Sequence, residues 1–369
     1  MRRKISTMKF AIVILIALVS TTTYGQYGQV TTPRVPSPAA MVSQTIGIST
    51  VTLKYSRPSV KGREIWGKLV PYGWNVQPFG EGNSAPWRAG ANENTVIEFS
   101  HDAKVEGQPV PAGAYGLTFV INKDNNGEVI LSKDYKSWGS FFYDPKQDEL
   151  RAKIQIRDIP MTEMLTYDFM NDTKTSSELV LNWEKKQFPV KIEYDVDKIV
   201  MDNAAKELKG ATGFNDIGFS SAAAYALQNN INLDQALVWS DQAIAQRKSL
   251  NNFALKSNIL KQMGKTEDAT KIISDIPNDV IAAASEIEIN AYGYQLLNAK
   301  NYDKAIEVLT LNTKRFPADP NTFDSLGEAY AIKGDKKNAI INFKKSLSMN
   351  PPAAVKANSE KYLHQLGVM

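Results

Sequence analysis

Apolar and polar residues alternate along the chain between residues 44 and 194. Val51, Leu53 and Tyr55 form one apolar row, and a longer run follows from Tyr115 to Ile121. Successive side chains on a strand point to opposite faces, so each run places one row against a core and the other toward water. No helical pattern separates the runs, which disfavours parallel pairing. The alternation predicts an antiparallel β-sandwich of roughly seven to nine strands over residues 36–195.

One hairpin of this sandwich is predicted at Asn126 and Gly127. The pair separates the run that ends at Asn122 from the apolar residues that begin at Val129. Asn-Gly suits a two-residue turn, because both positions adopt the positive φ angles that match strand twist.

Beyond about residue 198 the apolar residues recur at helical spacing, and the last part of the chain repeats itself. Three pairs of residues lie 34 positions apart: Gly293 and Gly327, Ala305 and Ala339, and Pro317 and Pro351. In a helix-turn-helix repeat, small residues let two helices approach closely, and proline ends the second helix. The spacing therefore predicts stacked helical hairpins.

The unit from Pro320 to Pro351 resembles the tetratricopeptide repeat. It follows that family in the order and spacing of Phe323, Leu326, Gly327, Tyr330, Ala339, Phe343 and Pro351. Ala236 and Ala269 mark two weaker units, and residues 353–366 form an amphipathic cap. The predicted fold class is α+β multidomain, with an antiparallel β-sandwich at 36–195 and an α-helical tetratricopeptide-repeat solenoid with a C-terminal cap helix at 216–369. Residues 196–215 are either a linker or an early helix.

Four segments of the N-terminal part form a recognisable series. They are PSPAAMVSQ at 36–44, YSRPSVKGR at 55–63, LVPYG at 69–73 and WRAGAN at 87–92. The series resembles the bacterial family known as domain of unknown function 2911, which is common in Bacteroidetes-type bacteria. The resemblance implies an exported, β-rich domain. The family brings no assigned reaction, so the resemblance assigns no catalytic residue.

A connection of some 38 residues, 57–94, has little periodicity and is dense in aromatic and basic side chains. Connections of this length in a compact domain are commonly functional or disordered, and the aromatic content argues against disorder. One hypothesis is a small-ligand pocket, for a glycan or a peptide, formed by Arg57, Lys61, Arg63, Trp66, Trp87, Arg88 and Asn92. The alternative is structural: the tryptophans plug the end of the sandwich, and the arginines bond loop carbonyls.

Little of the sequence favours catalysis. The chain has no cysteine and two histidines, His101 and His364, so the usual metal sites cannot be assembled and no metal or cofactor is predicted. His101 stands between Ser100 and Asp102, but neighbouring strand residues face opposite ways, so we expect no catalytic triad there. No catalytic residue is assigned. One alternative function stays open, a hydrolase of a glycan or ester with its site around Arg57, Arg88 and Glu93.

The first 25 residues have the three regions of a secretory signal peptide. Arg2, Arg3, Lys4 and Lys9 precede or flank the apolar run Phe10 to Val19, and a polar, small-residue stretch follows. A membrane anchor is the alternative, but the run is about half of the roughly 20 residues needed to span a bilayer. The formal net charge of +4 falls to about zero without this segment. We therefore expect a periplasmic or secreted protein, with no nucleic acid bound and no stable membrane anchor after cleavage.

Together these patterns predict an exported binding or interaction protein of the envelope. The helical repeats would bind a protein or peptide partner, and the β-domain would dock the stack or bind a small ligand. The candidate groove positions, all on first helices of the repeats, are Asn290, Asn298, Asp324 and Glu328. A hydrolase or a purely structural envelope component are the alternatives.

Overall fold

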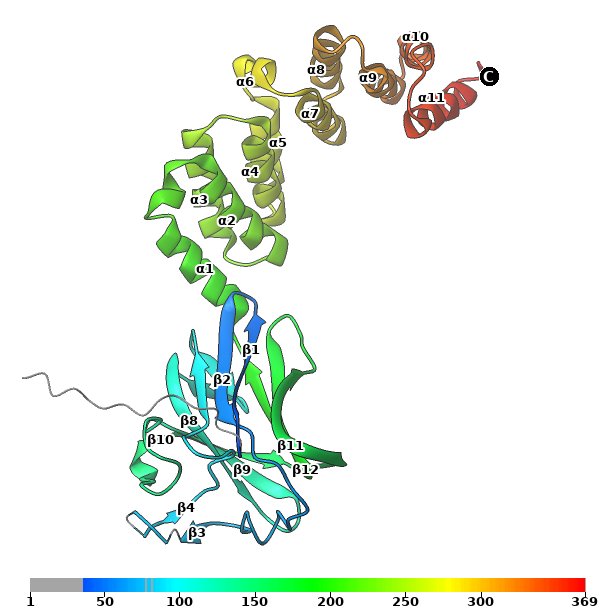
Figure 1. Ribbon diagram of the computed structural model, residues 1–369. Helices are drawn as coiled ribbons and strands as arrows, with labels where there is room; N and C mark the ends of the chain where they lie inside the picture. The colour runs from blue at the N-terminus through cyan, green and yellow to red at the C-terminus, as the bar shows by residue number, and fades with distance from the viewer. Residues whose placement is uncertain (1–35, 77, 81, 369) are drawn as a thin grey trace, which may run out of the picture.

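The computed structural model describes residues 36–76, 78–80 and 82–368, so the predicted signal peptide at 1–25 lies outside the described residues. A β-domain is followed by a row of helices that leads away from it to the C-terminus (Figure 1). In this part of the chain, no helix has the length and apolar character needed to cross a membrane.

The β-domain contains two main antiparallel sheets. The six-stranded sheet has the order β1 (Ala39–Ile46), β2 (Ser49–Ser56), β5 (Val96–Phe99), β8 (Gly113–Ile121), β9 (Asn126–Ser132) and β10 (Asp148–Gln155). The four-stranded sheet has the order β11 (Arg157–Met170), β12 (Ser176–Glu193), β6 (Ala103–Val105) and β7 (Gln108–Val110). A small pair, β3 (Asn75–Val76) and β4 (Ser84–Ala85), lies in the long connection from β2 to β5, and a 3-10 turn (Pro145–Gln147) precedes β10.

The core lies between the two sheets, as the alternation predicted. Leu53 on β2 is fully buried, whereas the neighbouring Lys54 is exposed. The Tyr55 ring meets Tyr167 of β11 edge-on at 4.8 Å, which joins one sheet to the other. The predicted antiparallel β-sandwich is therefore confirmed. Within the described residues it has more strands than expected, because strands of two or three residues give no readable alternation.

The hairpin between β8 and β9 is confirmed, but the prediction of its turn was wrong. Gly127 pairs with Ile121 inside the sheet, and the turn residue with positive φ is Asn125, at 62°. The Asp124 carboxylate accepts a hydrogen bond from the Asn126 backbone at 3.1 Å, which closes the turn locally. Gly127 instead permits close approach, since a Cβ there would lie 2.7 Å from a backbone oxygen of β8.

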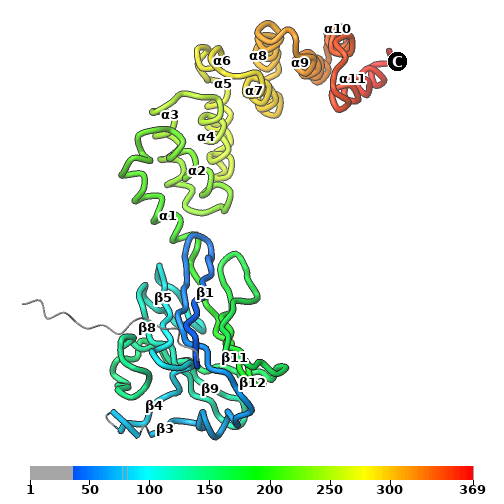
Figure 2. Tube along the Cα trace, viewed as in Figure 1, coloured from blue at the N-terminus to red at the C-terminus, as the bar shows by residue number. Residues whose placement is uncertain are grey.

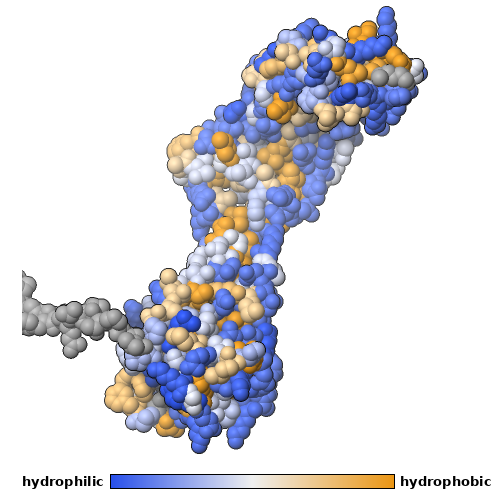
Figure 3. All heavy atoms as spheres, turned by 45° about the vertical axis from the view of Figure 1, so that its right-hand side comes forward, coloured by the Kyte–Doolittle hydropathy of each residue, from blue (hydrophilic) through white to orange (hydrophobic). Residues whose placement is uncertain are grey.

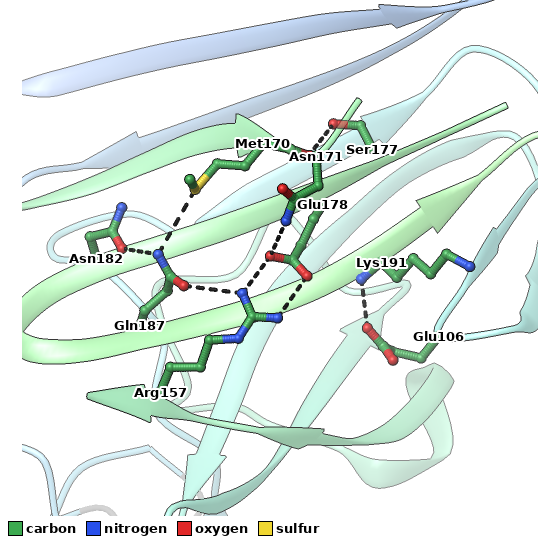
Figure 4. Close-up of polar contacts among 9 residues, drawn as sticks. All are labelled: Glu106, Arg157, Met170, Asn171, Ser177, Glu178, Asn182, Gln187 and Lys191. Carbon is green, nitrogen blue, oxygen red and sulfur yellow. Dashed lines mark hydrogen bonds and ion pairs between the residues drawn. The ribbon is translucent and has the colours of Figure 1, made fainter. Parts of the chain in front are cut away.

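The outer face of the four-stranded sheet carries a polar network (Figure 4). The Arg157 guanidinium donates to both carboxylate oxygens of Glu178, at 2.7 and 2.9 Å, and also to Gln187 at 3.2 Å. Arg157 pairs with Gln187 in the strand register, whereas Glu178 pairs with Met170 at the other end of the ribbon. Contact between them requires the β11–β12 ribbon to bend, in agreement with its register shifts. The ion pair thus spans the bend.

The helical part begins earlier than the first repeat. Its helices are α1 (Val196–Glu207), α2 (Asp216–Asn229), α3 (Leu233–Gln246), α4 (Leu250–Gln262), α5 (Thr266–Ser274), α6 (Asn278–Ala283), α7 (Glu286–Asn298), α8 (Tyr302–Arg315), α9 (Pro320–Lys333), α10 (Lys336–Leu347) and α11 (Ala353–Gln365), with a 3-10 turn (Ala211–Phe214) after α1. Most of residues 196–215 therefore form an early helix rather than a linker.

The residues that repeat every 34 positions occupy the predicted close contacts. A Cβ on Gly293 would lie 2.6 Å from Leu309, and a Cβ on Gly327 would lie 2.9 Å from Phe343, so a larger residue at these crossings of first and second helices would force the neighbouring side chain to move. Ala305 is fully buried at the corresponding crossing of its hairpin. The short helix α6 is inserted between the second and third hairpins, which accounts for the irregular spacing there.

Helix α1 joins the two parts of the molecule (Figure 2). Val196 at its start belongs to the sandwich core and packs against Gly47 in the β1–β2 turn, while Met201, further along, belongs to the first helical core. Lys174, from the β11–β12 turn, donates to Asn229 of α2 at 2.6 Å. The helices therefore leave the sandwich at the end that carries the β1–β2 turn.

Candidate functional site

The long connection between β2 and β5 encloses a cleft of about 560 Å³. Asn75 of β3 and Ala85 of β4 line it, so it lies at the end of the sandwich where Figure 1 shows β3 and β4. Helix α1 leaves from the opposite end. Of the seven residues predicted to hold a small ligand, the structure brings five to the cleft: Lys61, Arg63, Trp87, Arg88 and Asn92.

Arg57 and Trp66 lie outside the lining. The Arg57 guanidinium donates to the Leu165 carbonyl at 3.0 Å and to the Thr166 hydroxyl at 2.6 Å, which fastens the start of the connection to β11. The Trp66 indole N–H donates to Glu184 at 3.1 Å. Both side chains therefore act in holding the connection against the four-stranded sheet.

An aromatic cluster anchors the connection between the sheets. Trp87 stacks on Trp183 of β12, with ring centroids 5.8 Å apart and planes 13° from parallel. Trp66 meets both rings edge-on, and Phe188 packs beneath them. This is the arrangement that the structural alternative described. Trp87 and Trp183 also line the cleft, so the aromatic cluster that fills the end of the sandwich forms one side of the candidate ligand pocket.

The charged groups of the cleft have one sign. Lys61, Arg63 and Arg88 line it, and no Asp or Glu belongs to the part of the lining that the structure describes. Arg63 donates to the Val60 carbonyl at 3.0 Å, and Arg88 donates to the Asn92 carbonyl at 2.8 Å. Burial lowers the pKa of the Arg88 guanidinium from its usual value. The described lining of the cleft is therefore electropositive.

Among the lining residues that sequence reasoning did not name, two come from segments far along the chain. Ser140 comes from the segment between β9 and β10, and Trp183 comes from β12. Both are far from residues 57–94 in the sequence, and neither belongs to a local motif. Only the packing of the two sheets brings them to the connection.

Two of the four predicted groove residues, Asp324 and Glu328, lie where α9 contacts the first helices on either side of it, α7 and α11. Asp324 is 4% exposed and accepts hydrogen bonds from Ser359 and, at 2.8 Å, from Asn358 of α11. Glu328 accepts from the Tyr294 hydroxyl of α7 at 3.0 Å. Burial raises the pKa of the Asp324 carboxyl, the hydrogen bonds from α11 oppose this, and the charge of Glu328 adds to it.

The other two groove residues differ in exposure. Asn298 is exposed at the end of α7. Asn290 is half-buried, and its Oδ1 has no hydrogen-bond partner among the described residues. In the view of Figure 3, apolar residues gather along the middle of the helical stack and hydrophilic residues flank them.

The expectation that Ser100 and His101 face apart was wrong. The Ser100 hydroxyl and the His101 Nδ1 are 3.0 Å apart, because both residues lie in the turn between β5 and β6, where strand alternation does not apply. Asp102 instead accepts a hydrogen bond from the Ala112 backbone at 2.8 Å. The Ser100 hydroxyl also accepts from the Thr50 backbone at 2.8 Å. The described residues include no cluster of three or more histidine and acidic side chains suited to a metal ion.

Fold and sites together define a two-part protein, an antiparallel β-sandwich with an electropositive cleft and a stack of tetratricopeptide-type hairpins. The family described as "Protein of unknown function (DUF2911)" matches residues 37–192, and the tetratricopeptide repeat family matches residues 321–352. Both predicted resemblances are thereby confirmed. No curated protein matches the chain.

Solved structures that resemble the chain share little sequence with it. MamA from Desulfovibrio magneticus RS-1 is 16% identical with a TM-score of 0.30, and the match covers 43% of this chain and 96% of MamA. YrrB, described as a TPR protein with an unusual peptide-binding site, is 14% identical with a TM-score of 0.33, over 45% of this chain and 84% of YrrB. The Cut9–Hcn1 hetero-tetramer of APC/C is 16% identical with a TM-score of 0.32, and the match covers 47% of this chain and 34% of the matched chain. The repeat assignment rests on the hairpins themselves and on the family match.

Proposed function

We propose that this chain is an exported binding protein of the envelope, in which the helical repeats hold a segment of a partner protein and the β-domain holds a small ligand. The tetratricopeptide repeats support a protein-interaction role. The observation that carries the proposal is the face of α7, α9 and α11, where polar side chains of successive first helices meet.

The chemistry of this face favours a partner that supplies a cation. Asp324 and Glu328 accept hydrogen bonds from neutral side chains, and neither forms an ion pair with any residue between 36 and 368 that the structure describes. A carboxylate that is partly removed from water is stabilised by an opposite charge. A lysine or arginine of the partner, placed beside Glu328, would supply it.

Site-specific photocrosslinking on the full-length chain tests this part of the proposal. A photoreactive residue at Asn298, exposed at the end of α7, should capture a protein partner in cells, and the same residue at Ile341, exposed on the second helix α10, should not. Glu328→Gln should reduce the capture at Asn298. Equal capture at both positions, or no effect of the Glu328 change on the identified partner, would refute the groove.

The proposed location is periplasmic or secreted. It is supported by the signal-like residues 1–25 and by the near-neutral charge of the remaining chain. Cell fractionation with mass spectrometry of the mature N-terminus tests it, and we expect cleavage near Gly25. An uncleaved chain in the cytoplasm would refute it, and a chain with no partner in any compartment would favour a structural envelope component.

A further inference from the structure

The cleft of the β-domain includes two hydrogen-bond donors that are almost completely buried. Trp183 is 1% exposed and Ser140 is 5% exposed, and both line the cleft. The Trp183 Nε1 and the Ser140 Oγ have no hydrogen-bond partner among the described residues. Buried polar groups in native proteins are nearly always hydrogen-bonded, and an indole N–H can only donate. An acceptor placed in the cleft would satisfy both groups.

Both donors lie beside the same dipeptide of the connection. Trp87 stacks on Trp183 at 5.8 Å. Its neighbour Arg88 lies with its guanidinium 4.8 Å from the Phe141 ring, and a Cβ on Gly139 would lie 2.4 Å from the Arg88 Cζ. Arg88 thus contacts both neighbours of Ser140. Trp183 therefore lies beside Trp87, and Ser140 lies beside the half-buried guanidinium of Arg88.

The charge of the cleft selects the kind of acceptor. Among the described residues the Arg88 side chain donates one hydrogen bond, to the Asn92 carbonyl, which uses one of its five guanidinium N–H groups. The Lys61 ammonium is exposed and forms no hydrogen bond or ion pair within the described residues. Since the described lining has no carboxylate, nothing in it neutralises these cations. An anion would satisfy the donors and the charges together.

We propose that this cleft binds a small ligand through an oxyanion group, a carboxylate or a phosphate. The oxyanion pairs with Arg88 and accepts a hydrogen bond from Ser140, with Lys61 at the rim, and a second acceptor of the ligand lies beside the Trp183 indole. Trp87 and the proline-rich walls contact the rest of the ligand. The volume of about 560 Å³ suits a molecule of metabolite size. The inference deepens the β-domain half of the proposed function and is independent of the helical groove.

The indole N–H resonances of the ¹⁵N-labelled, full-length mature chain give a direct test. The chain has six tryptophans, and Trp183→Phe identifies the resonance of interest. Inorganic phosphate and benzoate are titrated at low ionic strength, with benzamide as the neutral isostere of benzoate. We expect a saturable shift of the Trp183 indole proton with at least one anion and none with benzamide. A response to phosphate alone or to benzoate alone identifies the oxyanion that the cleft prefers.

Variants separate this site from general charge effects. Arg88→Met should weaken anion binding about tenfold, the loss expected for one charge-assisted hydrogen-bonded pair. Because Arg88 also supports the connection, Ser140→Ala and Lys61→Gln provide variants with less risk to folding, and both should weaken binding severalfold. Lys68→Gln, exposed on the same connection but outside the lining, is the matched control and should bind as the parent does.

The proposal is overturned if neither anion shifts the Trp183 resonance, if benzamide shifts it equally, or if Lys61→Gln and Lys68→Gln weaken binding alike. Glu328→Gln should leave anion binding unchanged. If the chain does not bind anions but Glu328→Gln reduces partner capture, the anion site is refuted and the partner-binding site is supported. If the chain binds anions but Glu328→Gln leaves partner capture unchanged, only the partner-binding site is refuted.

Discussion

Replacing Phe343 with alanine tests whether the last hairpin is held together at the crossing of α9 and α10. The ring is fully buried, lies against Gly327, and stacks on Tyr362 of α11 at 5.1 Å with planes 14° apart. Truncating a buried phenylalanine costs about 3–5 kcal/mol, because transfer energy is lost and a cavity remains. Its cluster of fully buried apolar residues is small, with only Ala339 and Leu363 beside it among the described residues. We therefore expect a loss of about 3 kcal/mol, enough to unfold α10 and α11 locally.

Native-state hydrogen exchange on the full-length chain measures this loss segment by segment. Since each hairpin of a repeat stack contacts only its neighbours, protection should fall in α10, α11 and the adjoining part of α9, and persist in the sandwich. The matched control is Ile341→Ala on the same helix, where the side chain is 54% exposed and the expected loss is below about 0.5 kcal/mol. Equal loss of protection in β2 and β8, or no difference between the two variants, would refute the reasoning.

Three further changes test other contacts. Gly327→Ala gains about 1 kcal/mol of helix propensity but forces a Cβ to 2.9 Å from Phe343, at a cost of about 1–3 kcal/mol. Thermal melting followed by circular dichroism should therefore show a net loss of stability, and adding Phe343→Leu should relieve the contact. Burial raises the pKa of the Asp324 carboxyl, so its contribution to stability is full below the pKa of the unfolded carboxyl and is lost as the pH rises through the folded pKa. Urea unfolding across the acid range should show that Asp324→Asn removes this pH dependence of stability. An unchanged pH dependence would contradict the assignment to Asp324. Glu178→Gln breaks a half-exposed ion pair with Arg157 and should cost no more than about 1 kcal/mol, less at high salt, in the same assay.

The sequence predicted those features of the fold that depend on regular spacing. Alternation at Val51, Leu53 and Tyr55 gave the buried face of β2, because a strand exposes every second side chain. The 34-residue repeat identified Gly293 and Gly327 as contact points, because a larger residue at such a contact would force the neighbouring side chain to move. Each of these predictions concerns one helix or strand and its nearest neighbour. The spacing of residues in the local sequence is therefore enough to make it.

Predictions failed where tertiary contacts decide the local conformation. Gly127 has the composition of a turn but is needed within β9, where the backbone of β8 leaves no room for a Cβ. Ser100 and His101 have the position of strand residues but lie in a turn, which brings their side chains within hydrogen-bond distance. In both cases the same residues suit two conformations, and only the packed sheets distinguish them.

The candidate cleft could be predicted only in part. The length of residues 57–94 and their aromatic and basic content predicted a pocket there, and five of the seven named residues line the cleft. The sequence does not predict that the buried Ser140 and Trp183 lack a hydrogen-bond partner among the described residues, because the neighbours of both side chains are set by the packing of the two sheets.

The positions of the two sites limit how they can act together. The cleft lies at the β3–β4 end of the sandwich, and the groove lies on the last helices, beyond the opposite end (Figure 1). Helix α1 has Val196 in one hydrophobic core and Met201 in another, so it links the two parts through buried contacts rather than through a free tether. A ligand in the cleft and a partner on α7, α9 and α11 therefore do not touch. If binding leaves the packing around α1 unchanged, each site should bind with the same affinity whether or not the other is occupied, and the chain would hold the two bound components apart.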